Sequence, residues 1–270
     1  MNTTHAFMFR NKNIDPNLIM VAFKGTDPLD TDEWRIDIDI SWYKFRGVGR
    51  IHGGFMKALG LQKNRSMPKE IPSGSSPEKS FAYYTIREKL KNLISENKDA
   101  KFIVTGHSLG GALAILFASV LAIHGEELLL RKLEGVYTFG QPRVGDEEFG
   151  EVPYDDKTFL FKHFGPCLYF DSCYKGQVLG EEPNRNYFSL LYVVPKILNA
   201  IFEVIRGFIL PWRKGKEYKE GWFMKLLRIT LVPAPGVINH CPVDYVNSTR
   251  LGELPSSIYS QGPNLNLKQD

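Results

Sequence analysis

One short segment limits the possible folds of this chain more than any other. Residues 102–105 read Phe-Ile-Val-Thr, a continuous apolar run typical of a strand that is buried on both faces. Residues 112–123 are almost wholly apolar and rich in Ala and Leu, which predicts a buried helix. Between them lies Gly-His-Ser-Leu-Gly-Gly, residues 106–111, with Ser108 where the chain must turn. The segment therefore predicts a buried strand, a tight glycine turn and a buried helix in direct succession.

The neighbouring segments extend this pattern into an α/β fold. Another apolar run follows at residues 135–139, and the alternation of strand, helix and strand indicates a largely parallel sheet. Residues 6–10 and 18–24 are short apolar runs joined by Asn, Asp and Pro, which predicts a hairpin-like pair of strands. Residues 84–97 carry apolar side chains at helical spacing. A chain of 270 residues has room for one such domain with an insertion.

Ser108 is a candidate nucleophile. A serine nucleophile needs a sharp turn that lifts its hydroxyl clear of the sheet, small neighbours, and a helix N-terminus that stabilises developing negative charge. All three are predicted around Ser108. A Gly-x-Ser-x-Gly string alone arises by chance in about one chain in ten of this composition, so its place between strand and helix carries the prediction. The alternative, a glycine turn that only packs helix against strand, does not explain a serine at the apex.

A serine hydroxyl also needs a base, and in this arrangement the histidine follows the serine in the chain. His124 ends the helix after the turn and should point away from the site, and His163 lies in an aromatic run that resembles a strand. His240 lies in an expected loop between Pro233 and Pro242, from which its imidazole can reach Ser108. We expect His240 to be the base; the alternative is an ordinary surface histidine.

Ester hydrolysis also requires donors for the oxyanion. The backbone N–H of Leu109, directly after the serine, is one candidate. The second should come from a loop after an early strand, where Thr26 offers both an N–H and a hydroxyl. The alternative for Thr26 is a plain turn residue.

Together these stretches resemble the class 3 lipases, α/β-hydrolases similar to fungal triacylglycerol lipases, and in particular the plant oil-body-type lipases. The similar stretches are Val-Ala-Phe-Lys-Gly-Thr (21–26), Asp-Ile-Asp-Ile-Ser-Trp-Tyr (37–43), His-Gly-Gly-Phe (52–55), the serine turn (106–111), Phe-Gly-Gln-Pro-Arg-Val-Gly-Asp (139–146) and His-Cys-Pro-Val-Asp-Tyr (240–245). The resemblance implies that Ser108 is the nucleophile, His240 the base and Thr26 an oxyanion residue. It implies that His52 belongs to a structural motif near the site.

The resemblance has a gap where the family carries its catalytic acid. In the family, the stretch ending in Asp146 is followed by a helix, a strand and the aspartate that orients the histidine. Here seven residues, 147–153, precede Tyr154, where the similarity resumes, and a crossover to a parallel strand needs about a dozen or more. We therefore expect a sheet that is incomplete after residues 135–139, and the family's N-terminal region also to be absent. The possible substitute acids, each with the alternative of a solvated side chain, are Glu151, Asp155, Asp156 and Asp171.

Residues 188–210 form the most apolar stretch and predict an amphipathic helix. The polar residues Lys196, Asn199, Glu203 and Arg206 share one helical face, and the rest of the surface is apolar. Pro211 and Trp212 follow, and then residues 213–228 with six basic and two acidic side chains. An aromatic anchor and cations beside an apolar face are typical of helices that lie on anionic lipid surfaces. The alternative is a helix whose apolar face packs on the core.

Net charge, cysteine content and the lack of long apolar runs exclude several classes of protein. The net charge of +4 is that of the basic segment alone, which argues against nucleic-acid binding. The three cysteines, Cys167, Cys173 and Cys241, lack the paired spacing of a zinc site and are too few for a disulfide framework, so we expect no metal, no cofactor and a reducing compartment. We expect no cleaved signal in residues 1–13 and no spanning helix, since no apolar run reaches about 18 residues.

The sequence thus predicts an α/β-hydrolase domain over residues 1–252, with an amphipathic insertion at about 187–230 and a polar tail at 253–270. The predicted function is hydrolysis of triacylglycerol or another acylglycerol by Ser108 and His240, at a lipid droplet or at the cytosolic side of a membrane. The alternative is a catalytically impaired homologue that binds lipid surfaces and lacks the triad acid.

Overall fold

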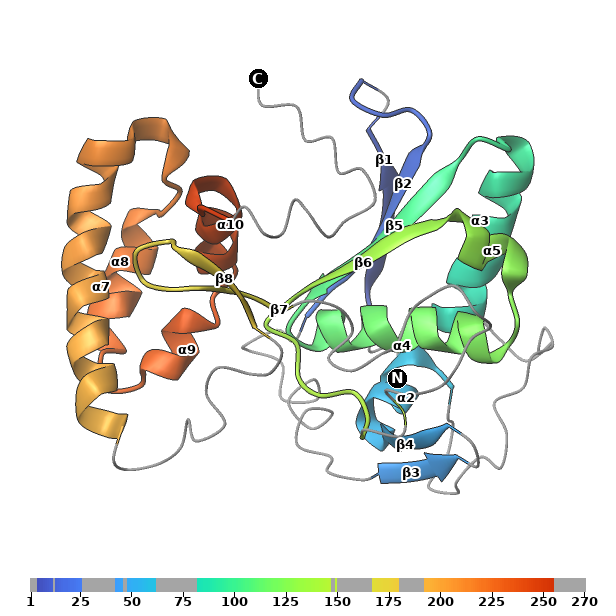
Figure 1. Cartoon of the computed structure of the whole chain (residues 1–270), viewed down its shortest axis with the longest axis horizontal. Helices are drawn as coiled ribbons and strands as arrows, with labels where there is room; N and C mark the ends of the chain where they lie inside the picture. Colours follow the sequence, from blue (N-terminus) through green and yellow to red (C-terminus); the bar gives the residue numbers. More distant parts are fainter. Residues whose placement is uncertain are drawn as a thin grey trace. The chain divides into compact units, whose positions relative to one another are not determined.

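A computed structural model of the chain describes residues 4–11, 13–25, 42–45, 48–61, 82–146, 149, 167–179 and 192–254. The chain divides into two compact units, Met1–Gly165 and Pro166–Asp270, and each is described by itself (Figure 1).

The first unit is built on a four-stranded sheet in the order β1-β2-β5-β6 (Figure 1). Its strands are β1 (Ala6–Arg10), β2 (Leu18–Phe23), β5 (Lys101–His107) and β6 (Leu133–Phe139). β1 and β2 pair antiparallel, whereas β2, β5 and β6 run parallel. The predicted α/β fold, the hairpin-like pair at the start and the largely parallel sheet are confirmed.

One face of this sheet forms the core of the first unit. Val21, Val104 and Val136 are aligned across neighbouring strands, and the first two are fully buried. Helix α4 (Leu109–Ile123) packs against this face, and every residue from Leu109 to Leu121 is buried, as expected of a helix that is apolar all round. The predicted strand, turn and helix are therefore present. A short helix that sequence reasoning missed, α5 (Glu127–Lys132), leads the chain back into β6.

Two further helices and a hairpin lie in the described residues of the first unit. The hairpin consists of β3 (Trp42–Phe45) and β4 (Gly49–His52), and helix α2 (Gly53–Leu59) follows it directly. Helix α3 (Ala82–Glu96) lies where the sequence predicts a helix over 84–97, and its apolar side chains Ile86, Leu90 and Ile94 enter the core.

The described side chains on the opposite face of the sheet are partly or largely exposed. Phe7, Ala22, Thr105 and Tyr137 form one row across the four strands, and Phe7 and Tyr137 are 62% and 50% exposed. Within the part of the chain that the structure describes, β6 pairs on one side only, with β5. The expected deletion after residues 135–139 concerns residues 147–153, of which only Phe149 is described.

The second unit consists of a hairpin and a group of helices. The hairpin joins β7 (Cys167–Phe170) to β8 (Gly176–Leu179). The helices are α7 (Val193–Lys214), the single 3₁₀ turn η2 (Gly215–Glu217), α8 (Trp222–Thr230), α9 (Pro235–Asn239) and α10 (Pro242–Leu251). None of the helices in the described ranges is long and apolar enough to span a bilayer.

The second unit corrects two sequence expectations. Helix α7 does not end before Pro211 but continues to Lys214, because the fixed φ of proline suits a helix and its missing N–H costs one bond in the last turns. Gly215, with φ of 56°, then ends the helix. Glu253, expected at the start of a loose tail, donates its N–H to the carbonyl of Tyr174 (3.0 Å) and accepts from the N–H of Gly176 (2.8 Å). The main chain of Glu253 is therefore tied to the hairpin.

Candidate active site

Ser108 occupies the turn between β5 and α4 in a backbone conformation that few residues adopt. Its φ is 56° and its ψ −129°, and Tyr174 is the only other non-glycine residue of the described ranges with a positive φ. Such a conformation costs about 1–3 kcal/mol and persists only where the surroundings enforce it. Here the N–H of Ser108 donates to the carbonyl of Phe139 (2.9 Å), and its carbonyl accepts from the N–H of Gly111 (2.9 Å). The turn is thus held between β6 and the first turn of α4.

Two glycines make this tight turn possible. A Cβ at Gly106 would lie 2.1 Å from the carbonyl oxygen of Gly110, and a Cβ at Gly110 would lie 2.2 Å from the carbonyl oxygen of Phe23. Real Cβ contacts are not this short, and the clashing atoms belong to the backbone and cannot swing away. The glycines of the turn therefore bring α4 against both β5 and β2.

Leu109 is the first residue of α4 and is 3% exposed. The first N–H groups of a helix have no acceptor within the helix, and the helix dipole places partial positive charge there. The structure therefore sets the N–H of Leu109 directly beside Ser108, as an oxyanion donor requires. Thr26, the predicted second donor, lies outside the described residues. Gly25, just before it, lies against the serine turn, since a Cβ there would be 2.6 Å from the carbonyl oxygen of His107.

His240 lies in the second unit, where it follows the last residue of α9 and is exposed. The segment from Pro233 to Pro242 is not the loop that the sequence predicts, because it contains α9, which begins with Pro235. Proline suits the first turn of a helix, where its missing N–H would have no acceptor. The structure brings Ser108 and Leu109 together in the first unit and holds His240 at a corner between two helices of the second.

Two other histidines, His124 and His52, contact aromatic residues of the first unit. The Nδ1 of His124 lies 2.7 Å from the hydroxyl of the buried Tyr83, which ties the end of α4 to α3. His52 is 7% exposed, and its ring stacks on that of Phe55 with a centroid distance of 4.2 Å. His163 lies outside the described residues.

Of the possible substitute acids, the structure describes Asp171. One oxygen of its carboxylate accepts the N–H groups of Cys173 (2.7 Å) and Lys175 (3.0 Å) and so closes the turn between β7 and β8. This is the local bonding of an Asx turn. Glu151, Asp155 and Asp156 lie outside the described residues.

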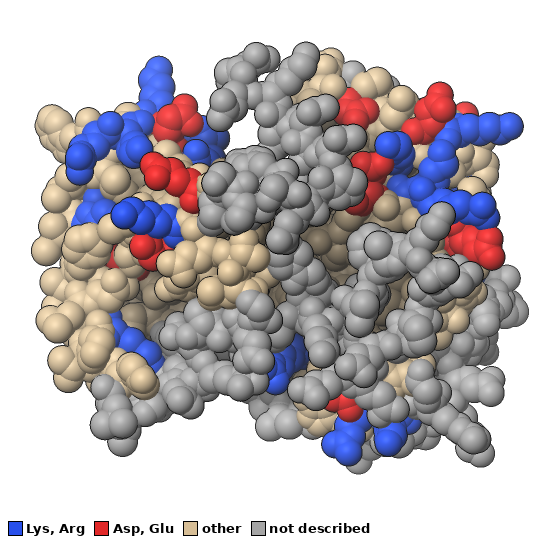
Figure 2. Space-filling model, viewed as in Figure 1, with Lys and Arg blue, Asp and Glu red and all other residues tan. Residues whose placement is uncertain are grey.

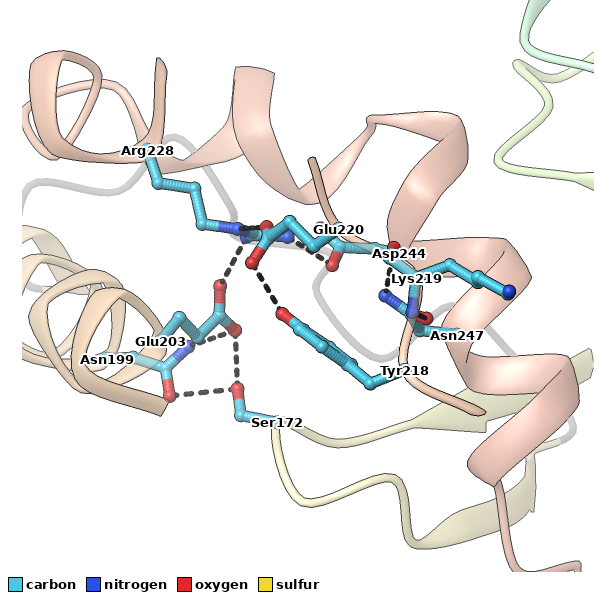
Figure 3. Close-up of polar contacts among 9 residues, drawn as sticks. All are labelled: Ser172, Asn199, Glu203, Tyr218, Lys219, Glu220, Arg228, Asp244 and Asn247. Carbon is cyan, nitrogen blue, oxygen red and sulfur yellow. Dashed lines mark hydrogen bonds and ion pairs between the residues drawn. The ribbon is translucent and has the colours of Figure 1, made fainter. Parts of the chain in front are cut away.

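Sequence reasoning missed a buried group of charges in the second unit, which we call the Arg228 cluster (Figure 3). The guanidinium of Arg228, whose side chain is 3% exposed, contacts carboxylates from three places in the chain: Glu203 on α7, Glu220 before α8 and Asp244 on α10. Tyr218 donates its hydroxyl to Glu220 over 2.5 Å, and Ser172 of the hairpin donates to Glu203 over 2.6 Å.

Electrostatics keep Arg228 charged although it is buried. Burial lowers the pKa of Arg228, but Asp244 and Glu220 outweigh burial and hold this pKa above its ordinary value. Burial is the largest cause acting on Asp244 and, with the nearby charge of Glu203, holds its pKa above the ordinary value although Arg228 lowers it. The position of Arg228 is a correction as well. It was counted in the basic segment 213–228, but it lies inside the unit and does not contribute a cation to the surface.

Helix α7 packs with its polar side inward. Its buried residues are Ala200, Glu203 and Gly207, and the guanidinium of Arg206 lies over the ring of the buried Tyr174, 4.6 Å from its centroid. The apolar side faces outward and consists of Leu198, Ile201, Phe202, Ile205, Phe208 and Ile209, with exposed fractions between 38% and 62%. The alternative of an apolar face packed on the core is therefore wrong for α7.

Helix α8 repeats this arrangement. Its buried residue is Arg228, whereas Trp222 and Phe223 are 66% and 74% exposed. The ring of Phe208 on α7 lies 6.0 Å from that of Trp222, and the ammonium of Lys225 lies 5.0 Å from the Phe208 centroid. Figure 2 shows uncharged side chains along α7 and basic side chains gathered near its C-terminal end.

A buried parallel strand, a strained serine and a helix N-terminus together form a nucleophile elbow, the feature that defines the α/β-hydrolase class. The family model described as lipase (class 3) matches residues 20–163, more than half of the chain. The chain belongs to the class 3 lipase family.

Three known proteins illustrate the similarity. The chain is 41% identical to triacylglycerol lipase OBL1 of Arabidopsis thaliana, over 93% of this chain and 56% of that protein. It is 39% identical to triacylglycerol lipase OBL1 of Nicotiana tabacum, over 94% of this chain and 59% of that protein. The chain thus spans less than three fifths of the length of these relatives. Among solved structures, the native Rhizomucor miehei lipase propeptide complex is 26% identical with a TM-score of 0.40, over 54% of this chain and 40% of that chain.

Proposed function

We propose that this chain hydrolyses triacylglycerol or another acylglycerol, with Ser108 as nucleophile and His240 as base. The observation that carries the proposal is the strained backbone of Ser108 beside the N-terminus of α4. Strain of this kind is costly and is characteristic of a nucleophile elbow. The names of the OBL1 relatives support the substrate class.

The proposed reaction has two stages. The Ser108 hydroxyl attacks the ester carbonyl carbon while His240 accepts its proton, and the N–H of Leu109, with Thr26 as second donor, stabilises the oxyanion. The carbon–oxygen bond to the glyceride then breaks, and His240 returns the proton to the leaving alcohol. Water, deprotonated by His240, attacks the acyl carbon; the bond to Ser108 then breaks, His240 gives its proton to the Ser108 oxygen, and the fatty acid is released.

We propose that α7 and α8 bring the protein to a lipid surface, a lipid droplet or the cytosolic side of a membrane. The outward apolar face of α7 supports this proposal, because an exposed apolar stripe of this length is unfavourable in water. Each apolar side chain that moves from water into lipid contributes about 1.5–3 kcal/mol. Cations near the C-terminal end of α7 suit an anionic surface.

A second candidate function is that of a lipid-binding homologue with little hydrolytic activity. The short stretch 147–153 leaves no room for the family's acid-bearing strand, and Asp171 is engaged in a turn. Loss of the triad acid lowers turnover by about 10⁴-fold in a serine protease whose geometry is otherwise intact. On this account, Asp→Asn changes at Asp155, Asp156 and Asp171 have little further effect.

One pair of assays separates these functions. Turnover of emulsified triolein that disappears in Ser108→Ala supports the hydrolase, and the same assay on a version with the missing segment restored shows how much the acid adds. Flotation with anionic vesicles tests the surface, since Ile201→Glu combined with Phe208→Glu should abolish binding. Leu128→Glu on α5 is the matched control, because Leu128 is also about half exposed, at 49%. A protein that floats with vesicles but does not hydrolyse triolein is a lipid-binding homologue with little activity. If the α7 variant floats as well as the unmodified protein, α7 does not bind the lipid surface.

A further inference from the structure

His240 lies in the two-residue connection between helices α9 and α10, which we call the corner. α9 ends at Asn239 and α10 begins at Pro242, so His240 and Cys241 form the whole connection. The N–H of Cys241 donates to the carbonyl of Ile238 (2.9 Å), and its carbonyl accepts from the N–H of Asp244 (3.0 Å). The backbone of the corner is therefore bonded to both helices, and it moves if either helix moves.

Buried polar contacts hold α10 at two places one turn apart. Asp244 binds the guanidinium of Arg228. Asn247, fully buried, accepts the N–H of Lys219 (2.8 Å) with its side-chain oxygen and donates to the carbonyl of Lys219 (3.0 Å). Residues spaced by three lie on the same face of a helix, so both contacts fix one side of α10. Asn247 is the only residue of α10 that is buried, so the deepest contact of this helix is a polar one.

The residues that Asp244 and Asn247 contact are held by further contacts of their own. Arg228 is also bound by Glu220, one residue from Lys219, and by Glu203 of α7. Helix α7 approaches closely because Gly207 has no side chain, and a Cβ there would lie 2.8 Å from a carboxylate oxygen of Glu220. The anchor for α10 therefore joins α7, the segment before α8 and α8 (Figure 3).

We infer that Asp244 and Asn247 are positioning residues that set the place of His240 through this anchor. The inference rests on the proposed role of His240 as the base. Its physical basis is that a misplacement of about 1 Å in a reacting group can cost about 10²-fold in rate.

The test compares three variants in the full chain. Asp244→Ala and Asn247→Ala each remove one contact of α10, while Asp244→Asn keeps an acceptor for Arg228. Arg250→Ala is the matched control, because Arg250 also binds a neighbouring segment from α10, contacting Glu217 (2.8 Å), but lies near the C-terminal end of the helix and is 40% exposed. Hydrogen exchange of peptides covering residues 238–245 measures the corner directly.

We expect both alanine variants to speed exchange in residues 238–245 while α7 stays protected, with Asp244→Asn close to the unmodified protein and Arg250→Ala unchanged. On a soluble short-chain ester, kcat should fall by about 10²-fold in the alanine variants with little change in KM. Unchanged corner exchange in both alanine variants, or an equal effect of Arg250→Ala, overturns the inference. If Asp244→Ala unfolds the second unit, the result for Asn247→Ala alone tests the inference, because that variant keeps all ion pairs of Arg228.

The exchange experiment does not depend on activity. An unmodified protein that neither hydrolyses esters nor labels Ser108 with an organophosphonate contradicts the proposed function. Exchange at the corner still shows whether Asp244 and Asn247 hold the histidine segment.

Discussion

Replacing Arg228 with Met should destabilise the second unit far more than any surface charge does. The substitution keeps much of the side-chain volume but leaves Glu220, whose side chain is fully buried, and Glu203, whose side chain is 9% exposed, without their cation. Breaking a buried ion pair by removing one partner costs about 3–5 kcal/mol, because a charge stays buried without compensation. That is a large share of the typical stability of a domain, about 5–15 kcal/mol.

The first unit offers a matched control. Arg131 and Glu127 form a 2.7 Å ion pair on α5 with side chains 75% and 67% exposed, and such pairs contribute about 0–1 kcal/mol. Hydrogen exchange during urea unfolding reports the two units separately, so Arg228→Met should lower protection in the second unit alone and Arg131→Met in neither. Adding Glu220→Gln to Arg228→Met should recover part of the loss, because it removes the deepest uncompensated charge.

The stability of the Arg228→Met variant should change with pH in one direction. Burial raises the pKa of Asp244 and Arg228 lowers it, so without Arg228 this pKa stays above that of the unfolded chain and the folded state binds more protons. Stability of the variant should therefore fall as pH rises from about 4, the ordinary carboxyl pKa, towards neutrality. Protection in Arg228→Met that equals the unmodified protein, or that improves with rising pH, would refute this reasoning.

Three further outcomes concern the first unit. Burial raises the pKa of Asp146, but hydrogen bonds from the N–H groups of Arg50 and Phe149, with the charge of Arg50, hold this pKa below its ordinary value. The stabilising contribution of the carboxylate is therefore lost as pH falls through the lowered pKa. Acid unfolding followed by circular dichroism should show a shallower loss of stability in Asp146→Asn. Tyr83→Phe leaves His124 without the 2.7 Å contact and should cost about 1 kcal/mol in urea unfolding, and a variant as stable as the unmodified protein would contradict that value. Gly110→Ala should cost about 1–3 kcal/mol or prevent folding, since its Cβ meets backbone 2.2 Å away, and a normal melting temperature would show that the turn can relax.

The parts of the fold that sequence reasoning predicted correctly are those with local signals. The turn around Ser108 combines a strand, glycines and an apolar helix within about twenty consecutive residues, and each of these signals is visible without knowledge of the rest of the chain. The antiparallel pair of β1 and β2 and helix α3 were predicted on the same basis.

The parts that were missed depend on contacts between distant residues. The spacing of polar side chains in α7 predicts two faces but not which one is buried, because burying Glu203 requires a cation 25 positions later, at Arg228. Arg228 itself looks like one member of a surface basic segment. His240 was expected in a loop because two prolines bound it, but both prolines begin or precede helices, α9 and α10.

The inverted packing of α7 changes what substitutions this helix can accept. In an ordinary surface helix, the apolar stripe is sensitive and the polar face accepts almost any side chain. In α7 the inward stripe consists of Ala200, Glu203 and Gly207. A side chain at Gly207 meets the carboxylate of Glu220, and an uncharged residue in place of Glu203 removes one of the carboxylates that pair with Arg228. The outward residues need only remain apolar, and exchanges among Leu, Ile, Val and Phe there leave the ion pairs of the Arg228 cluster intact. Saturation mutagenesis of α7 should therefore show that its exposed apolar side tolerates apolar substitutions, whereas the buried positions Ala200, Glu203 and Gly207 tolerate few.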